Sequence, residues 1–203
     1  LLNLPAIPGP GAIGRVRAFG PDATHLRQGD WVYCDPTFRS RDDVRSPDIT
    51  LQGWSAGNDG GLRLQQHFRH GSWAEQTRVP TENAIRIGEL TDADAIKWCA
   101  LGTLLVPYGG WLAANLKAGE TVLVSGATGN FGSAAVAVAL AMGAACVIAA
   151  GRNEAVLADL GRRFGPRVRT LTLSGEEDAD RERMKQVAPG LDIDALRDRG
   201  ARA

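Results

Sequence analysis

The chain has 203 residues, enough for one large domain or two modest ones with cores of their own. Its 23 Lys and Arg residues balance its 23 Asp and Glu residues, so no net charge favours binding to nucleic acid or to an anionic membrane. The three cysteines lie far apart, which argues against a disulfide framework and is typical of a protein of the reducing cytoplasm.

The first ninety residues are expected to form a β-rich domain. Short alternating or apolar runs are separated by Gly, Pro, Asn and Asp, the pattern of strands joined by turns. These runs cover residues 12–18, 30–34, 72–79 and 84–87. Residues 35–71 form a long polar segment without a clear element, which is typical of a functional lobe or a mobile loop.

The pattern becomes helical at Thr91, which is expected to cap a helix with carboxylates in its first turn. A second helix is expected around residues 112–116. We therefore place a domain boundary near residue 91, which gives domains of residues 1–91 and 92–203.

Residues 121–173 alternate between short apolar strands and helices. Strands are expected at residues 121–125, 145–149 and 168–173, and helices at residues 133–142 and 154–164. This alternation predicts a parallel α/β sheet, half of a doubly wound fold. The apolar stretch 134–150 is close to the length of a membrane span, but Gly143 divides it into a helix and a strand, so we expect no membrane segment.

A glycine-rich turn follows the first of these strands and leads into a helix, the context that makes such a turn informative. It consists of Gly126, Ala127, Thr128, Gly129, Asn130, Phe131 and Gly132. Glycines allow a tight turn and a close approach of the backbone to a pyrophosphate, and the helix N-terminus offers N–H groups to the phosphates. The sequence therefore predicts a dinucleotide-binding site.

Arg152 and Asn153 follow the second strand of this unit. An NAD site usually has Asp or Glu at this place, where the carboxylate binds the ribose hydroxyls. A guanidinium instead favours the additional phosphate of NADP. We therefore predict NADP(H) as the cofactor, with Arg152 at the 2′-phosphate and Asn153 beside it.

The chain resembles the medium-chain dehydrogenase/reductase family, whose members pair a GroES-like catalytic domain with a Rossmann domain. The matching residues are Gly14, Val16, Gly20, Gly29-Asp30 and Val32, the segment 71–75 (Gly-Ser-Trp-Ala-Glu), and the segment 118–124 before the glycine turn. The resemblance implies an α/β chain: a partial GroES-like β-rich domain followed by the first half of a Rossmann doubly wound parallel sheet.

Two departures from that family predict a zinc-independent member, similar to quinone oxidoreductases and alcohol-dehydrogenase-like proteins. Zinc-dependent members carry a Gly-His-Glu triplet where this chain has Gly9-Pro10-Gly11, and residues 35–71 contain no cysteine for a structural zinc lobe. His67 and His70 lack further ligands nearby and are interpreted as loop residues, so no metal is predicted.

The resemblance implies hydride transfer between the nicotinamide and a small carbonyl, quinone or alcohol substrate, with little acid–base chemistry from the protein. No catalytic residue is assigned. The hydroxyls of Tyr108 and Thr103 and the rings of Trp73 and Trp111 are candidates for substrate contact, although packing roles are favoured. Cys34 and Cys99 are interpreted as core residues.

The chain begins with Leu, and the expected fourth strand near residue 191 is polar, so we expect a fragment of a longer enzyme. Two alternatives stay open: a catalytically inactive NADP-binding remnant, and an NmrA-like redox-sensing protein that binds NADP without reducing anything. An unpaired sheet edge in such a fragment would make homo-oligomers possible.

Overall fold

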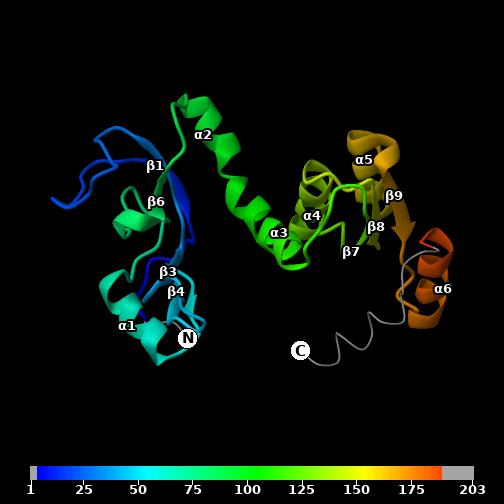
Figure 1. Ribbon diagram of the computed structural model, residues 1–203, viewed down its shortest axis with the longest axis horizontal. Coiled ribbons are helices and arrows are strands. Elements are labelled where there is room, and N and C mark those ends of the chain that lie inside the picture. The colour runs from blue at the N-terminus through cyan, green and yellow to red at the C-terminus, as the bar shows by residue number, and fades with distance from the viewer. Residues whose placement is uncertain (1–3, 189–203) are drawn as a thin grey trace. The chain divides into compact units, whose positions relative to one another are not determined.

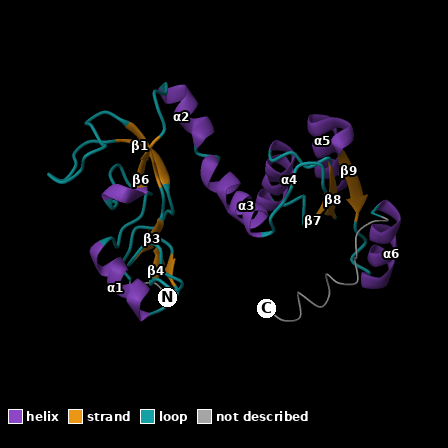
Figure 2. Ribbon diagram, in the orientation of Figure 1, coloured by secondary structure: helices purple, strands orange, loops and turns teal. Residues whose placement is uncertain are grey.

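The computed structural model of the protein describes residues 4–188, and its contacts divide the chain into two compact units, Leu1–Ala100 and Leu101–Ala203 (Figure 1). The first unit contains mostly short strands and loops, and the second alternates strands with helices (Figure 2). The domain boundary near residue 91, placed where the sequence pattern becomes helical, stays a prediction.

The first unit contains two three-stranded antiparallel sheets. One has the order β1-β2-β6, formed by Ala12–Arg15, Trp31–Cys34 and Ala84–Arg86. The other has the order β3-β4-β5, formed by Thr37–Arg39, Ile49–Leu51 and Ser55–Ala56. Its helices are α1 (Asp59–His67), a single 3₁₀ turn (Thr81–Asn83) and α2 (Asp92–Trp98).

The core of the first sheet is β2, whose four residues are all buried. Trp31 donates a hydrogen bond from its indole to the Leu90 carbonyl at 2.7 Å, so the aromatic ring is buried without leaving its N–H unpaired. Cys34 is buried as predicted, and burial raises the pKa of its thiol, which keeps it protonated at neutral pH.

Residues 35–71 are more regular than the sequence predicted, since they contain the second sheet and α1. The helix packs against β4 because two of its residues are glycines. A Cβ on Gly61 would lie 2.2 Å from the Ile49 carbonyl oxygen, and one on Gly60 would lie 1.9 Å from the Asp48 carboxylate. Polarity was misleading here because helix and sheet meet through backbone and buried polar groups.

The strand predicted at residues 72–79 was wrong, since that segment has no regular structure. Its backbone instead crosses the loop before β1. The N–H groups of Gly71, Ser72 and Trp73 donate to the carbonyls of Ile7, Gly9 and Pro8 at 2.8, 2.9 and 3.0 Å. Hydrogen bonds between two loops produce no regular spacing of apolar residues in the sequence. The alternating pattern of residues 72–79 therefore could not predict them.

Helix α2 begins where the sequence predicted. The Thr91 hydroxyl oxygen accepts a hydrogen bond from the Asp94 N–H at 3.2 Å. The interpretation of Cys99 as a core residue was wrong, because this residue is exposed after the end of the helix, with its thiol directed to the Ala95 carbonyl. Cys99 follows a helix of which no residue is buried, so the apolar neighbours that suggested a core position do not form a core here.

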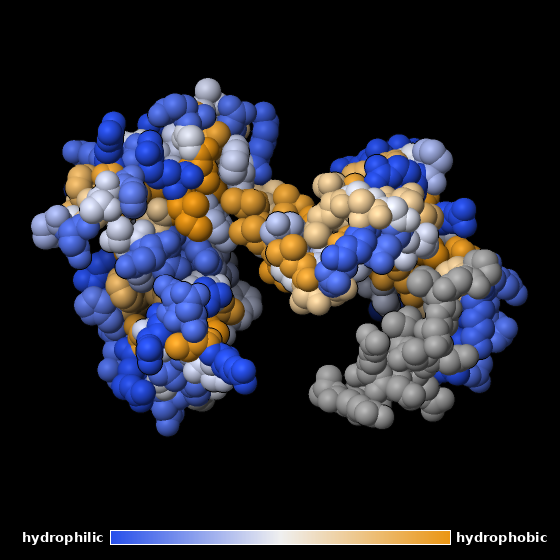
Figure 3. Space-filling view, in the orientation of Figure 1, coloured by the Kyte–Doolittle hydropathy of each residue, from blue (hydrophilic) through white to orange (hydrophobic). Residues whose placement is uncertain are grey.

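The second unit opens with α3 (Leu101–Ala113), which is much longer than the helix predicted around residues 112–116. Pro107 and the pair Gly109-Gly110 lie within it, although proline and glycine are unfavourable inside a helix. Apolar side chains gather on its surface (Figure 3). The exposed ones include Leu105, Val106, Tyr108 and Leu112.

The rest of this unit follows the predicted alternation of strands and helices. The strands are β7 (Thr121–Ser125), β8 (Cys146–Gly151) and β9 (Val168–Thr172). The helices are α4 (Asn130–Ala141), α5 (Glu154–Phe164) and α6 (Glu177–Val187), with a 3₁₀ turn at Gly165–Arg167. The strands pair in parallel in the order β7-β8-β9, which confirms the predicted parallel sheet.

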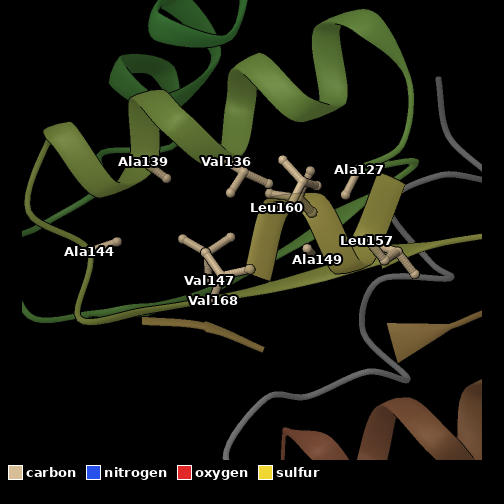
Figure 4. Packing of buried hydrophobic residues seen from close by; sticks show 10 residues of the cluster. Ala127, Val136, Ala139, Ala144, Val147, Ala149, Leu157, Leu160 and Val168 are labelled. Carbon is tan, nitrogen blue, oxygen red and sulfur yellow. The ribbon is translucent and has the colours of Figure 1, made fainter. Parts of the chain in front are cut away.

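Helices cover both faces of this sheet, as a doubly wound fold requires. On one face, Val147 and Ala149 of β8 pack against side chains of α4 and α5 (Figure 4). On the other face, Ile148 and Ala150 form a core with Leu171, against which the C-terminal part of α6 packs. Because successive residues of a strand point to opposite faces, β8 is buried on both, as a central parallel strand should be.

Within residues 4–188 no helix is both long and apolar enough to cross a bilayer. The fourth strand expected near residue 191 lies outside the described residues.

Candidate functional site

The glycine-rich turn lies at the carboxyl end of β7, between this strand and α4 (Figure 1). Gly126 has a φ of +70°, a backbone conformation that costs glycine nothing and other residues substantially. The Gly129 N–H closes the turn by donating to the Gly126 carbonyl at 2.9 Å, and α4 begins at the next residue. The helix therefore starts three residues earlier than predicted, and Asn130, Phe131 and Gly132 are its first turn.

Gly132 allows the helix to approach the turn closely. A Cβ at this position would lie 2.0 Å from the Gly126 carbonyl oxygen and 2.9 Å from the Ala127 Cα. No side chain can be accommodated against that backbone. The third glycine of the motif thus has the packing role that the sequence assigned to it.

The N-terminus of α4 can receive an anion. Gly129 is its N-cap and provides no side-chain acceptor, and the first backbone bond in this turn runs from the Ser133 N–H to the Gly129 carbonyl. The N–H groups of the first turn, together with the positive end of the helix dipole, are the chemistry that binds a phosphate. Because Gly129 provides no side-chain cap, the N–H groups of this turn fit a dinucleotide pyrophosphate.

Two residues of the motif face inwards. Ala127 is fully buried, and its N–H donates to the Ala150 carbonyl at 2.9 Å, so it holds the turn to β8 and offers no N–H to a ligand. Thr128 is half-buried and lies against Gly151, the last residue of β8. By contrast, Asn130 and Phe131 are exposed.

Arg152 directly follows β8 and is exposed. Since Ser125 of β7 pairs with Ala150 of β8, the ends of the two strands are level, and Arg152 begins at the same edge as the glycine turn. Asn153 has a structural role: its side-chain oxygen accepts from the Val156 N–H at 3.1 Å and caps α5. Both predicted residues therefore leave the carboxyl edge of β8, one as an exposed cation and the other as a helix cap.

Two further residues shape this edge and were not found from the sequence. The Ser133 hydroxyl donates within the first turn of α4, to carbonyls that include Gly129 at 2.9 Å. Gly151 provides the space that Thr128 fills. A small residue at the end of a strand is a weak signal, and its partner becomes known only with the register of β7 and β8.

The segment Gly9-Pro10-Gly11 does not fit a zinc ion. Its residues have no donor side chains, and the carbonyls of Gly9 and Gly11 accept from the Ser72 hydroxyl at 3.1 and 2.6 Å. A Cβ on Gly9 would lie 2.5 Å from Cδ1 of Trp73, so this corner is closed by packing. Among residues 4–188, no three His, Cys, Asp or Glu residues gather in a group that could hold a metal ion.

Of the two histidines interpreted as loop residues, His70 lies in a loop, whereas His67 is the last residue of α1. The His70 Nδ1 accepts from the Ile7 N–H at 3.2 Å, and the His67 ring packs edge-on against Phe68. Neither contact places a further metal ligand beside His67 or His70.

The aromatic and hydroxyl candidates for substrate contact lie apart in the chain. Trp73 is 73% exposed and Tyr108 is 42% exposed, so neither is a core residue of its unit. Trp111 is half-buried, and its indole donates to the Ala135 carbonyl of α4 at 3.0 Å. Thr103 lies in the first turn of α3 and is half-buried. Trp111 therefore has the structural role that the sequence favoured for it.

The chain is similar to proteins of known family. Residues 1–89 match the model of the alcohol dehydrogenase GroES-like domain. No curated protein sequence matches.

Solved structures match over both units. One, provisionally assigned as an alcohol dehydrogenase from Sinorhizobium meliloti 1021, is 32% identical with a TM-score of 0.65, over 91% of this chain and 46% of that one. The alcohol dehydrogenase TADH from Thermus sp. ATN1 is 22% identical with a TM-score of 0.73, over 93% and 53%. A cobalt- and zinc-bound alcohol dehydrogenase from Pyrobaculum aerophilum is 24% identical with a TM-score of 0.61, over 87% and 51%.

The chain spans about half the length of these solved structures. Its fold is the predicted one, a GroES-like β-rich part followed by a parallel α/β sheet with a glycine turn. Residues 1–89 thus resemble the GroES-like domain of alcohol dehydrogenases, and the chain as a whole is similar to the medium-chain dehydrogenase/reductase family in sequence and fold.

Proposed function

We propose that the protein is an NADP(H)-dependent oxidoreductase that transfers hydride between the nicotinamide and a small carbonyl, quinone or alcohol substrate without zinc. The observation that carries this proposal is the carboxyl edge of the sheet. There, the N-terminus of α4 has no side-chain cap and lies directly against the glycine turn, which we call the glycine cradle (residues 126–132). The exposed Arg152 begins at the same edge.

The residues of this edge have separate roles in the proposed complex. The N–H groups of the first turn of α4 bind the pyrophosphate, because that turn lacks a competing acceptor. Arg152 binds the 2′-phosphate, since a guanidinium pairs well with phosphate oxygens and a carboxylate at this place would repel them. Asn153 supports Arg152 by capping the helix that follows. The bound cofactor supplies or accepts the hydride.

We propose a reaction without zinc because of the segment Gly9-Pro10-Gly11. A tetrahedral zinc site needs several N, S or carboxylate donors that converge. This segment supplies none, and its carbonyls already accept hydrogen bonds from Ser72. Substrate binding without a metal would depend on apolar contact and on orientation by the fold.

The chain spans about half the length of the solved structures it matches. The substrate, the oligomeric state and the cytoplasmic location of the whole enzyme are therefore part of the proposal. The balanced charge of the chain and its scattered cysteines support a cytoplasmic enzyme that acts on small molecules rather than on nucleic acid.

Cofactor titration tests the site. We expect NADPH to bind more tightly than NADH, as measured by cofactor fluorescence and by the rise in Tm. Arg152→Ala should weaken NADPH binding by about tenfold, or about 1.4 kcal/mol, because it removes a charge-assisted contact, and should leave NADH binding unchanged. The matched control is Arg169→Ala. Arg169 is also exposed, but it lies near the amino end of β9, where it pairs with Ile148, away from the glycine turn. Equal affinity for both cofactors, unchanged in Arg152→Ala, would refute the NADP assignment.

Turnover separates an enzyme from the two alternatives. Oxidation of NADPH with a quinone, an enone or an aldehyde, followed at the nicotinamide absorbance, supports the oxidoreductase. Binding of NADPH without turnover of any of these substrates would favour an inactive remnant or a redox-sensing protein. Incubation with a zinc chelator should not change the rate.

A further inference from the structure

We propose that Gly151 is a positioning residue that sets where Arg152 lies relative to the glycine turn, and thereby determines the preference for NADPH over NADH. The inference rests on the proposed cofactor site and adds to it a residue that contacts neither phosphate.

The space beside Gly151 is filled by one side chain of the glycine turn. A Cβ on Gly151 would lie 2.6 Å from Cγ2, 3.0 Å from Oγ1 and 3.3 Å from Cβ of Thr128. Threonine is branched at Cβ and has few rotamers, so it cannot fold away as a long side chain would. An alanine at residue 151 must therefore turn the Thr128 side chain or displace the turn that carries it.

The backbone around Gly151 has little room to move in compensation. The carbonyl of Ala150 accepts from the Ala127 N–H, and the carbonyl of Gly151 accepts from the Leu173 N–H, each at 2.9 Å. A shift of Gly151 away from Thr128 would weaken one or both of these bonds. The contact between Gly151 and Thr128 thus links the ends of β7, β8 and β9.

The spacing between the turn and Arg152 matters for one cofactor more than for the other. The pyrophosphate and the 2′-phosphate belong to one molecule, so the two sites must be a fixed distance apart for both contacts to form. A guanidinium–phosphate pair is directional and loses strength when its partner is displaced. NADH has no 2′-phosphate, so a shift at residue 151 should lower the affinity for NADPH more than that for NADH.

The experiment compares the dissociation constants of NADPH and NADH for four proteins: the wild type, Gly151→Ala, Thr128→Ala and the double variant. Cofactor fluorescence gives the constants, and circular dichroism checks the fold. We expect Gly151→Ala to reduce the NADPH:NADH preference by about tenfold, and the added Thr128→Ala to restore part of it, because the double variant lacks Cγ2 and Oγ1, the two nearest atoms, and keeps only the Cβ at 3.3 Å.

The matched control is Gly161→Ala in α5, where an added Cβ would lie 3.8 Å from Thr170 Cγ2, an ordinary contact. This variant should keep the wild-type preference. If Gly151→Ala is unfolded alone, the double variant still tests the contact, because it lacks the two nearest atoms.

The outcomes are distinguishable. A wild-type preference in Gly151→Ala would overturn the inference, and so would an equal loss for both cofactors that Thr128→Ala does not rescue, since that is the signature of a merely structural glycine. Failure of the wild type to bind either cofactor would overturn the proposed function and this inference with it.

Discussion

The two units of the chain are stabilised by different kinds of contact. In the second unit, small aliphatic side chains of strands and helices fill the cores on both faces of the sheet. In the first unit, buried polar side chains and close backbone crossings take a larger part, as Thr50, Gln52 and Gln65 are almost completely buried there.

One crossing in the first unit shows the contrast. Gly9, Gly53 and Gly71 meet with their backbones in contact: the Gly9 N–H donates to the Gly53 carbonyl, and a Cβ on Gly53 would lie 2.6 Å from the Gly71 Cα. Among residues 101–188 of the second unit, the comparable place is the contact of Gly132 with Gly126, and there it shapes the proposed site. Close backbone approach is thus part of the scaffold in the first unit and part of the proposed cofactor site in the second.

The largest effect is expected for Gly132→Ala. Its Cβ would lie 2.0 Å from a backbone oxygen, which cannot rotate away, so α4 must move off the turn. We expect a loss of about 3 kcal/mol in the free energy of unfolding, with NADPH binding abolished. Denaturant unfolding and cofactor titration measure the two effects. Unchanged binding would mean that the cradle is not where the pyrophosphate lies.

A slightly smaller effect is expected for Gly71→Ala in the first unit. The added Cβ would lie 2.4 Å from the Gly9 carbonyl oxygen and 2.8 Å from the Gly53 Cα. We expect a loss of about 2 kcal/mol in the free energy of unfolding, while NADPH affinity stays the same, because the cradle belongs to the second unit. Gly14→Ala, which meets no atom within 4 Å, is the control and should be neutral. Loss of cofactor affinity in Gly71→Ala would show that the two units depend on each other.

The same contrast explains how much of the fold could be predicted. In the second unit, the period of apolar residues coincides with the elements: the strand at 121–125 and the helix at 154–164 have the predicted bounds. In the first unit, residues 72–79 have a strand-like pattern but bond to the loop around Pro8, and residues 35–71 lack a pattern but contain a sheet and a helix. Long-range backbone contacts leave no local period to detect.

The candidate site was predictable to a similar degree. The glycine turn and Arg152 are contiguous motifs, so they could be found, and the structure brings both to the same edge. The inward position of Ala127 and the contact between Thr128 and Gly151 could not, because they require the register between two strands. Tyr108 and Trp73 were expected to be packed, yet they are exposed in their own units.

The buried polar groups of the first unit allow a paired test. Gln52 donates from its amide to the carbonyls of His70 and Arg78 at 2.8 and 2.7 Å, whereas both side-chain polar atoms of Gln65 are buried without a hydrogen-bond partner. Gln52→Leu should therefore destabilise by about 2 kcal/mol, since two carbonyls lose their donor.

Gln65→Leu, of similar volume, should instead stabilise the protein by about 1 kcal/mol, because it removes an unsatisfied amide. Denaturant midpoints of the two variants, measured side by side, give the comparison. Destabilisation by both would contradict the assignment and indicate that Gln65 is hydrogen-bonded, for example by a buried water.

The smallest effect concerns pH and a carboxylate of the second unit. Asp180 accepts hydrogen bonds from the Ser174 N–H and hydroxyl and from the Gly175 N–H at 2.7 to 2.8 Å. These bonds to Ser174, followed by those to Gly175 and the charge of Arg183, lower the pKa of the Asp180 carboxyl below its ordinary value, against the opposing effect of burial. The loop after β9 is therefore held by an ionised group.

Because the folded-state pKa of Asp180 lies below the unfolded value of about 3.9, its contribution to stability is fully present above that pH and is lost as the pH falls through the folded-state pKa. Asp180→Asn should lower Tm at neutral pH and reduce the acid-dependent part of the curve. The control is Asp159→Asn, a carboxylate paired on the surface with Arg162 and Arg163, which should shift Tm little. Parallel pH curves for the wild type and Asp180→Asn would contradict the expectation. In that case the loop after β9 would be held by packing of α6, and the second unit would depend on its apolar core even at this polar edge.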